Sequence, residues 1–361
     1  MVTAVYIHIP FCQNICPYCD FCKLFYHEDW VNKYLQALKK EIINNYKGEI
    51  IKTIYIGGGT PSCLDNQQLL MLFDIIKIIN KDNDVEFTFE CNIEDISLEL
   101  VKLLKINGVN RISVGIQTFN DEFLKILHRF HTYKDVLLKI SLLKKYFTNI
   151  NVDLMYGFNN QTLEQLKNDL DMFLKLDINH ISTYSLMIEP HTKFYIDKVK
   201  AIDDKIDYDM FLLINKTLKN NGFNHYEISN YTKNFVSRHN IGYWNNNFYY
   251  GFGLGASGYI DDVRYDNTRS LFKYLNGDYI KNFHRLSLNE TMENTMILGL
   301  RKIAGVNMKK FIDKYQCEIK EIFIIDSLLA SKKLLITGDN IHINNDFLYV
   351  SNDILINFIG L

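Results

Sequence analysis

The chain has 361 residues, of which 47% are hydrophobic and 23% are charged, a composition typical of a globular protein and not of a disordered one. Its 40 Lys and Arg nearly balance its 42 Asp and Glu, so there is no basic field to hold nucleic acid, and no nucleic-acid partner is expected. At about 150 residues per domain, the length fits two domains, or one large α/β barrel with a small appendage.

The N-terminal segment contains no signal-peptide pattern. Tyr6-Ile7-His8-Ile9-Pro10 leads directly into a group of cysteines, which predicts a protein of the reducing cytoplasm. The longest uncharged run, 240–260, is rich in Asn and Gly and lacks aliphatic density, so we do not interpret it as a transmembrane segment.

Six short runs rich in β-branched and aromatic residues predict strands at 3–9, 51–56, 85–90, 111–116, 150–155 and 180–186. Between them the apolar residues recur at helical spacing, as in Trp30, Tyr34, Leu38 and Ile42, and a capping box, Thr162-x-x-Gln165, opens one of these helices. The alternation of strand and helix predicts the α/β class with a parallel sheet.

From about residue 205 the pattern changes. A helix through Phe211, Ile214 and Leu218, a strand at 223–228 and a stretch rich in Gly, Asn and aromatic residues predict an extension of the barrel edge. Helices at 290–300 and 319–331 and a hairpin at 334–343 predict a small α+β domain, similar to a winged helix. The expected divisions are 1–204, 205–280 and 281–361.

Four of the seven cysteines, Cys12, Cys16, Cys19 and Cys22, fall within eleven residues. In a reducing compartment such a group indicates a metal centre and not disulfides. Cys12-x-x-x-Cys16-x-x-Cys19 can ligate three irons of a cubane cluster, which leaves the fourth iron open for a ligand. The alternative is a zinc site made by all four cysteines, although structural zinc sites usually take their ligand pairs from separate segments.

Polar residues follow the predicted strands where each one ends. Gly57-Gly58-Gly59-Thr60 ends the second strand and Glu90 the third, Gln117 follows the fourth, and Asp153 lies at the end of the fifth. Because the carboxyl ends of parallel strands meet at one mouth, these residues are expected to converge there.

The cysteine spacing directly after Tyr6-Ile7-His8-Ile9-Pro10-Phe11 resembles the radical S-adenosylmethionine (SAM) superfamily. More narrowly, it resembles the branch that contains oxygen-independent coproporphyrinogen III oxidase (HemN) and the haem chaperone HemW. The resemblance covers nearly the whole chain and implies a partial (β/α)6 barrel. It implies a [4Fe-4S] cluster on Cys12, Cys16 and Cys19, whose open iron binds SAM and whose electron cleaves it to a 5′-deoxyadenosyl radical.

By the same resemblance, a set of residues around the mouth is expected to contact SAM. They are Tyr6, Tyr18, Gly58, Gly59, Thr60, Glu90, Gln117, Arg129 and Asp153. In two loops this chain has another residue where the family has a proline. These residues are Ile93 in Glu90-Cys91-Asn92-Ile93 and Asn159 in Tyr156-Gly157-Phe158-Asn159.

Three features favour the chaperone over the oxidase. HemN carries a long extension ahead of its cluster, for which the short segment before Cys12 leaves no room, and Phe21 stands where HemN has a further cysteine. The motif His239-Asn240-Ile241-Gly242-Tyr243-Trp244 matches one implicated in haem binding in HemW, so His239, Tyr243 and Trp244 are candidate haem contacts. In the alternative interpretation of this motif, His239 bonds a neighbouring loop and the two aromatic residues anchor the core.

The resemblance thus implies a haem chaperone with three bound groups, a [4Fe-4S] cluster, SAM and haem, that delivers haem to a haemoprotein such as a respiratory-chain component. Peripheral membrane association and a homodimer are compatible with that role. The alternative is radical oxidation of coproporphyrinogen III. A third interpretation is a radical SAM enzyme with an unrelated substrate.

Overall fold

A curved sheet of twelve strands forms the larger part of the protein, whose residues 1–360 are described by a computed structural model. The six predicted strands lie side by side and parallel, in chain order. They are β1 (Ala4–Ile9), β4 (Ile51–Gly58), β5 (Lys81–Asn92), β6 (Arg111–Gln117), β7 (Asn149–Tyr156) and β8 (His180–Ser185). The sheet ends at β14 and β9 without closing, which confirms the predicted partial barrel.

The extension predicted after residue 205 exists, but it is divided between the two edges of the sheet. Beside β8, β10 (Asn230–Thr232) and β9 (Asn224–Glu227) are added antiparallel. Beside β1, the parallel β11 (Tyr249–Phe252) is followed by the antiparallel β12 (Ser257–Ile260), β13 (Val263–Asn267) and β14 (Ile280–Arg285). Two short strands, β2 (Phe11–Cys12) and β3 (Leu24–Phe25), close the cysteine loop at its base.

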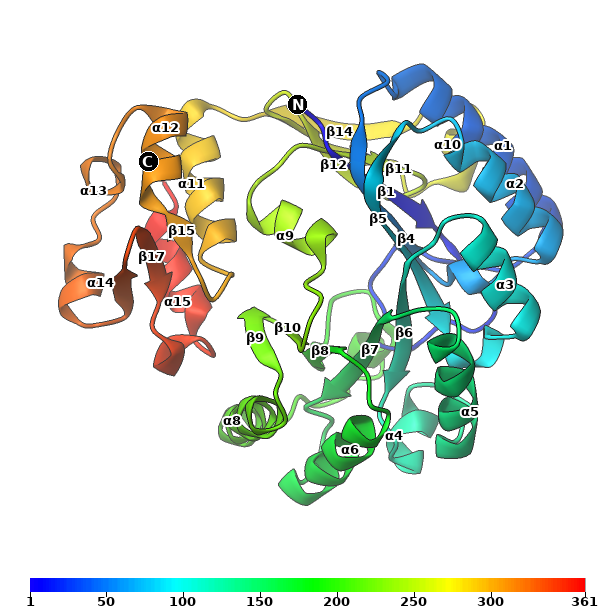
Figure 1. Cartoon of the computed structure of the whole chain (residues 1–361), viewed down its shortest axis with the longest axis horizontal. Coiled ribbons are helices and arrows are strands. Elements are labelled where there is room, and N and C mark those ends of the chain that lie inside the picture. The colour runs from blue at the N-terminus through cyan, green and yellow to red at the C-terminus, as the bar shows by residue number, and fades with distance from the viewer. Residues whose placement is uncertain (361) are drawn as a thin grey trace.

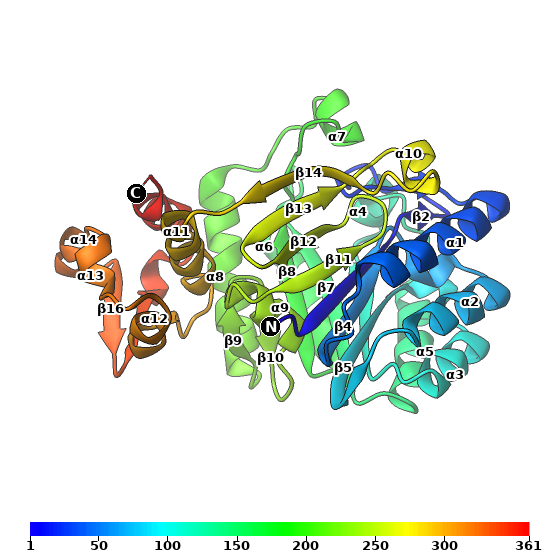
Figure 2. The same cartoon turned by 90° about the horizontal axis from the view of Figure 1, so that it is seen from above.

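Helices cover the convex face of the sheet (Figure 1). They are α1 (Glu28–Asn45), α2 (Asn66–Ile76), α3 (Leu98–Ile106), α4 (Asp121–Ile126), α5 (Tyr133–Lys144), α6 (Leu163–Lys175) and α8 (Asp204–Asn220), with the short α10 (Leu271–Leu275). The short α7 (Lys193–Ile196) follows β8 and lies outside this layer (Figure 2). The predicted capping box is present at the start of α6, where Thr162 and Gln165 bond each other's backbone N–H.

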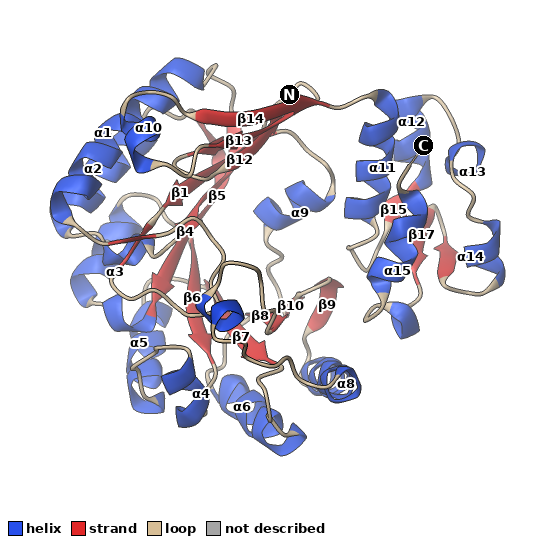
Figure 3. Cartoon of the chain, turned by 180° about the vertical axis from the view of Figure 1, so that it is seen from behind, coloured by secondary structure: helices blue, strands red, loops and turns tan. Residues whose placement is uncertain are grey.

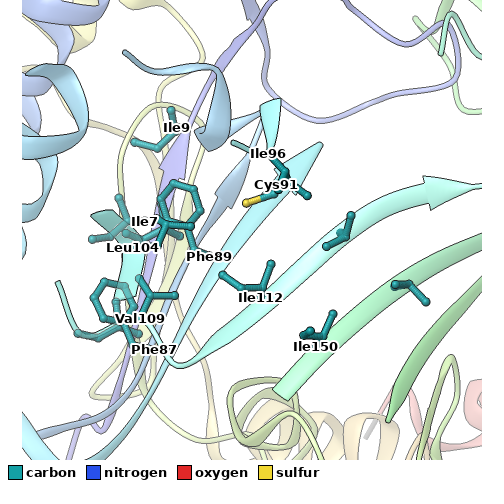
Figure 4. Packing of buried hydrophobic residues seen from close by; sticks show 14 of the residues in the cluster. Ile7, Ile9, Phe87, Phe89, Cys91, Ile96, Leu104, Val109, Ile112 and Ile150 are labelled. Carbon is teal, nitrogen blue, oxygen red and sulfur yellow. The ribbon is translucent and has the colours of Figure 1, made fainter. Parts of the chain in front are cut away.

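The main core fills the space between the strands and these helices. Figure 4 shows Ile7 of β1, Phe89 of β5 and Ile112 of β6 on the same side of the sheet as Leu104 of α3, and all four are fully buried. Because alternate strand residues point to opposite faces, this outer face is apolar while the inner face is free to carry polar groups. The site described below lies on that inner face.

One helix, α9 (Arg238–Trp244), stands apart from the outer layer, in the opening between the two edges of the sheet (Figure 3). It is fixed to the sheet by polar contacts. The N–H groups of Arg238 and His239 donate to the buried carboxylate of Glu86 at 3.0 Å each, and the ring of His239 lies 5.2 Å from that of Tyr55. The predicted haem motif therefore lies at the sheet and not on an outer surface.

A smaller unit follows β14 and lies to one side of the curved sheet (Figure 2). It contains α11 (Leu288–Gly299), α12 (Met308–Tyr315), α13 (Ile319–Ile322), α14 (Asp326–Ala330), α15 (Ser351–Leu355) and a sheet in the order β15 (Val306–Asn307), β17 (Asn340–Ile343), β16 (Leu334–Thr337). Its apolar residues form a hydrophobic cluster of their own, around Met296, Phe311, Leu334 and Ile341. The exact domain boundaries stay a prediction.

One helix prediction in this unit is wrong. The segment 319–331 forms two short helices instead of one, because Phe323 is extended (φ −115°, ψ 138°) and ends α13. Phe323 and Ile325 are buried while Ile324 is 87% exposed, an alternation typical of extended chain. Within residues 1–360, no helix combines the length and the apolar character needed to cross a membrane.

Candidate functional site

The inner face of the sheet opens into a cavity of about 300 Å³ at the carboxyl ends of the parallel strands, as predicted. Eleven of the predicted site residues line it together. They are Cys12, Cys16, Tyr18, Cys19, Gly58, Gly59, Thr60, Glu90, Gln117, Arg129 and Asp153. The backbone of Gln117 is left-handed (φ 75°), a conformation that side-chain-bearing residues rarely adopt and that turns the chain at the cavity wall.

The cysteine loop is fastened to the strands on either side of it. Its two ends are joined where the N–H of Tyr26 donates to the carbonyl oxygen of Cys12 at 2.9 Å. The hydroxyl of Thr60 donates to the Cys12 sulfur at 3.5 Å. Burial raises the pKa of Cys12 to about 11, so its thiolate form needs a positive partner such as a metal.

Gly59 allows the end of β4 to lie close to the cysteine loop. A Cβ atom at this residue would lie 2.8 Å from the carbonyl oxygen of Phe11 and 2.9 Å from the sulfur of Cys12, closer than such atoms can come. Two backbone bonds of 2.8 Å, Gly59 N–H to Ile9 and Thr60 N–H to Phe11, hold the strand end against the loop. The glycine is therefore required for packing, whether or not it also contacts a ligand.

Two half-buried carboxyl groups face the cavity, Glu90 from β5 and Asp153 from β7. Burial raises the pKa of Glu90 to about 7 and that of Asp153 to about 6. Glu90 accepts hydrogen bonds from the Tyr55 hydroxyl at 2.6 Å and the Gly58 N–H at 3.1 Å, and Asp153 accepts one from Asn151 at 2.8 Å. A bound cation would offset the cost of keeping both groups ionised, so the pair fits the amino and sulfonium groups of SAM.

Arg129 carries a positive charge at this cavity, and only 10% of its side chain is exposed. Burial lowers its pKa, but the neighbouring Cys16, Tyr18 and Glu94 outweigh that effect and keep the guanidinium charged. The group donates to Asn92 at 2.6 Å, and its Nε–H has no partner among the described residues. A guanidinium with an unused donor fits a ligand carboxylate.

Within residues 1–360, no three His, Cys, Asp or Glu side chains are placed to bind one metal ion. A cubane does not need such a group, because each of its cysteines binds a different iron. Cys22 lines a different cavity, against Gly255 and Arg269, and does not join the other three.

This second cavity, of about 480 Å³, adjoins the first and shares Glu90 and Phe21 with it. Its walls are largely aromatic, and its lining includes Tyr6, Phe21, Tyr55, Tyr243, Tyr249, His8, His239 and Arg269. Tyr6 was predicted to contact SAM, but the structure does not bring it into the first cavity. Its hydroxyl is bonded to the His8 ring at 2.9 Å.

His239 is buried, and both of its ring nitrogens have partners. Nδ1 lies 2.9 Å from the Thr53 hydroxyl and Nε2 lies 2.8 Å from the Tyr243 hydroxyl. Burial lowers the pKa of His239 to about 3, so the imidazole is neutral at every physiological pH. In this arrangement the ring holds Tyr243 in place, and it would have to part from that hydroxyl to bind iron.

The third residue of the haem motif, Trp244, does not face this cavity. It is next to Tyr243 in α9 and so points to another side of the helix, where its Nε1–H donates to Glu227 at 2.8 Å. The guanidinium of Arg301 lies 5.9 Å from its ring centre. Trp244 therefore joins α9 to the β9 edge and the C-terminal unit.

The sequence interpretation missed several lining residues. Asn92, Ser113 and Tyr184 belong to the first cavity and Arg269 to the second. A signal for Arg269 did exist, since arginines are few in this lysine-rich chain. Asn92 lies in the family loop Glu90-Cys91-Asn92-Ile93, although no role was assigned to it, and nothing in the sequence singled out Ser113 and Tyr184.

This chain is similar in sequence to known proteins of one superfamily. Residues 6–173 match the sequence profile of the radical SAM superfamily. Curated proteins named haem chaperone HemW are similar over nearly the whole chain. Identity is 39% with the protein of Lactococcus lactis (99% of this chain, 97% of the relative) and 38% with that of Bacillus subtilis (99% and 99%). The Escherichia coli protein of the same name is 34% identical over 77% of each chain.

Among solved structures, the coproporphyrinogen III oxidase HemN from Escherichia coli is similar, with a TM-score of 0.88 over 99% of this chain and 90% of that one. The identity is 19%, so this likeness concerns the fold.

Proposed function

Because this chain belongs to the radical SAM superfamily, in the family of the HemW haem chaperones, we propose that it binds haem beside a SAM-ligated [4Fe-4S] cluster and delivers the haem to haemoproteins. The observation that carries the proposal is the 39% identity to a curated haem chaperone over 99% of this chain. Radical SAM proteins as a superfamily use such a cluster with SAM.

In this proposal Cys12, Cys16 and Cys19 hold the cluster. Their shared cavity supports this assignment, as does the absence of any room for a side chain between Gly59 and Cys12. When bound, the cluster with SAM supplies one-electron chemistry.

The residues proposed for SAM divide by charge. Arg129 binds the carboxylate through its unused donor, while Glu90 and Asp153 bind the positive groups, which favour the ionised form of both carboxyl groups. Gly58, Gly59 and Thr60 bring their backbone to the ligand, and Tyr18 and Gln117 close the wall.

Haem is proposed to bind in the second cavity. The aromatic walls support this, since aromatic rings pack on a porphyrin face. Among the described lining residues, Arg269 is the only Lys or Arg, and it is exposed at the rim, where its guanidinium can bind a propionate. His239 and Tyr243 belong to this site as a bonded pair, whereas Trp244 is proposed to act only by holding α9.

The same proposal includes a client haemoprotein such as a respiratory-chain component, peripheral association with a membrane, and a homodimer. They rest on the resemblance to haem chaperones.

The test is a haemin titration by absorbance on the anaerobically reconstituted full chain. Arg269→Gln should weaken binding about tenfold, the effect of losing a charge-assisted hydrogen bond. Arg285→Gln is the matched control, because Arg285 is exposed on β14 and donates to a backbone oxygen outside the cavity. His239→Ala should weaken the Soret band.

Tyr243→Phe separates two roles of His239. If Nε2 binds the iron, losing the Tyr243 hydroxyl frees it and tightens haemin binding. If the pair only forms the wall, the variant leaves affinity unchanged and His239→Ala acts through Tyr243. Coproporphyrinogen turnover without haemin binding would refute the chaperone and favour the oxidase.

A further inference from the structure

A third cavity, of about 550 Å³, lies where α9 meets the C-terminal unit, away from both cavities described above. One wall is the end of α9 and the loop after it, with Trp244, Asn245 and Asn247. The other walls come from the end of α11, from β15 and from α12. Its size is that of a site for a small molecule.

The charge of this cavity is of one sign. Lys302, Lys310 and Lys314 line it, and no Asp or Glu is among its described lining residues. None of these three ammonium groups forms an ion pair with a carboxylate within residues 1–360. The nearby Asp339 pairs with Lys309, at 2.9 Å.

No opposite charge brings the lysines together: Lys302 donates to the Oδ1 of Asn245, and the ammonium group of Lys314 lies 4.9 Å from the ring centre of Tyr315. Lys310 and Lys314 are one helical turn apart on α12, so they lie on the same face and repel each other. Lys302 is half-buried, and both this burial and the charge of Lys310 lower its pKa. The first turn of α12 contains no acidic residue that would offset the positive end of the helix dipole. A bound anion would relieve this repulsion.

The remaining polar groups fit an oxygen-rich anion. Asn245, Asn247, Asn307 and Asn340 line the cavity with Lys302, and amide NH₂ groups donate hydrogen bonds. Asn307 is oriented by the fold: its carbonyl oxygen caps α12 through the Lys310 N–H at 3.0 Å, and its NH₂ donates to Asn340 at 2.8 Å.

The cavity is also tied to the haem motif. Asn246, in left-handed conformation (φ 53°), donates to the Thr295 hydroxyl of α11 at 3.2 Å. Trp244 lines the cavity at the end of the helix that carries His239 and Tyr243. A ligand here would bridge α9 and the C-terminal unit.

We propose that this cavity binds the phosphate group of a small molecule, through Lys302, Lys310 and Lys314 and the surrounding amides. The concave shape favours a phosphate compound over an extended polyanion, and the chain as a whole has a net charge of −2. A free organophosphate and a phospholipid headgroup offer the same chemistry, and the experiment distinguishes them.

The test is calorimetric titration of the full chain with inorganic pyrophosphate, in parallel with sedimentation on vesicles of phosphatidylglycerol or of neutral phosphatidylcholine. The double variant Lys310→Gln/Lys314→Gln should bind pyrophosphate at least tenfold more weakly. Lys309→Gln is the matched control, since Lys309 belongs to the same helix but pairs with Asp339 outside the cavity. Lys302→Gln alone should also weaken binding, and thermal unfolding checks that each variant is folded.

Two outcomes support the proposal. If the wild type binds pyrophosphate but not vesicles, and the double variant does not bind pyrophosphate, the ligand is a free phosphate compound. If the protein sediments with phosphatidylglycerol vesicles, if pyrophosphate displaces it from them, and if the double variant no longer sediments, the ligand is a phospholipid headgroup. Absence of binding to either probe, or equal binding by the double variant and Lys309→Gln, would overturn it.

Discussion

The packing of Gly59 against the cysteine loop gives the sharpest prediction. In Gly59→Ala, the added Cβ would lie 2.8 Å from the backbone of Pro10 and Phe11 and 2.9 Å from the Cys12 sulfur. The loop cannot simply retreat, because the Gly59 N–H is bonded to Ile9 at 2.8 Å. Overpacking of this kind costs about 1–3 kcal/mol, and the upper end is expected here because the contacts are with backbone.

The assay has two readouts. Urea unfolding of the cluster-free protein should show a loss of about 3 kcal/mol in Gly59→Ala. Iron per chain after anaerobic reconstitution should fall, because Cys12 is displaced. Gly242→Ala is the control: a Cβ there would have only Asn247 near it, at 3.9 Å, and its helical position predicts a gain of about 0.5–1 kcal/mol. An unchanged urea midpoint and full iron content in Gly59→Ala would show that the close contact between residue 59 and the cysteine loop is not required.

Three further predictions concern other parts of the protein. Burial raises the pKa of Asp169 from 3.8 to about 6, so the stability contributed by its protonated form is complete below pH 4 and lost as the pH rises through 6. The variant Asp169→Asn keeps the bond to Thr118 and cannot ionise. In urea unfolding it should be more stable than the wild type by up to about 3 kcal/mol at pH 8 and equal to it at pH 3.5. Trp244→Phe removes the hydrogen bond to Glu227 and should cost about 1–3 kcal/mol without changing haemin affinity; weaker haemin binding would contradict the placement of Trp244. Cys22→Ser should keep full iron content, measured after reconstitution, and a loss of iron would return Cys22 to the cluster.

The local sequence determined the elements and their order. Alternation of apolar strands with helices of period 3.6 predicted the six parallel strands, and the Thr162-x-x-Gln165 box predicted the start of α6, because both signals act within a few residues. The convergence of Glu90, Gln117 and Asp153 was also predictable, since parallel strands bring their carboxyl ends to one edge.

Only the tertiary structure decided how these residues divide among cavities. Tyr6 and Cys22 lie close to the cluster cysteines in sequence, yet both line the second cavity. Tyr6 pairs with Gly251 of β11 and Cys22 packs against Gly255, so residues far along the chain place both of them there. The motif around His239 was read as one site, whereas the helical rotation between Tyr243 and Trp244 points them to different cavities. The lysines of the third cavity gave no signal in the sequence, because Lys302 meets Lys310 only through the packing of α12 against the end of α11. Side-chain direction and long-range packing depend on the whole fold, and a local pattern does not contain them.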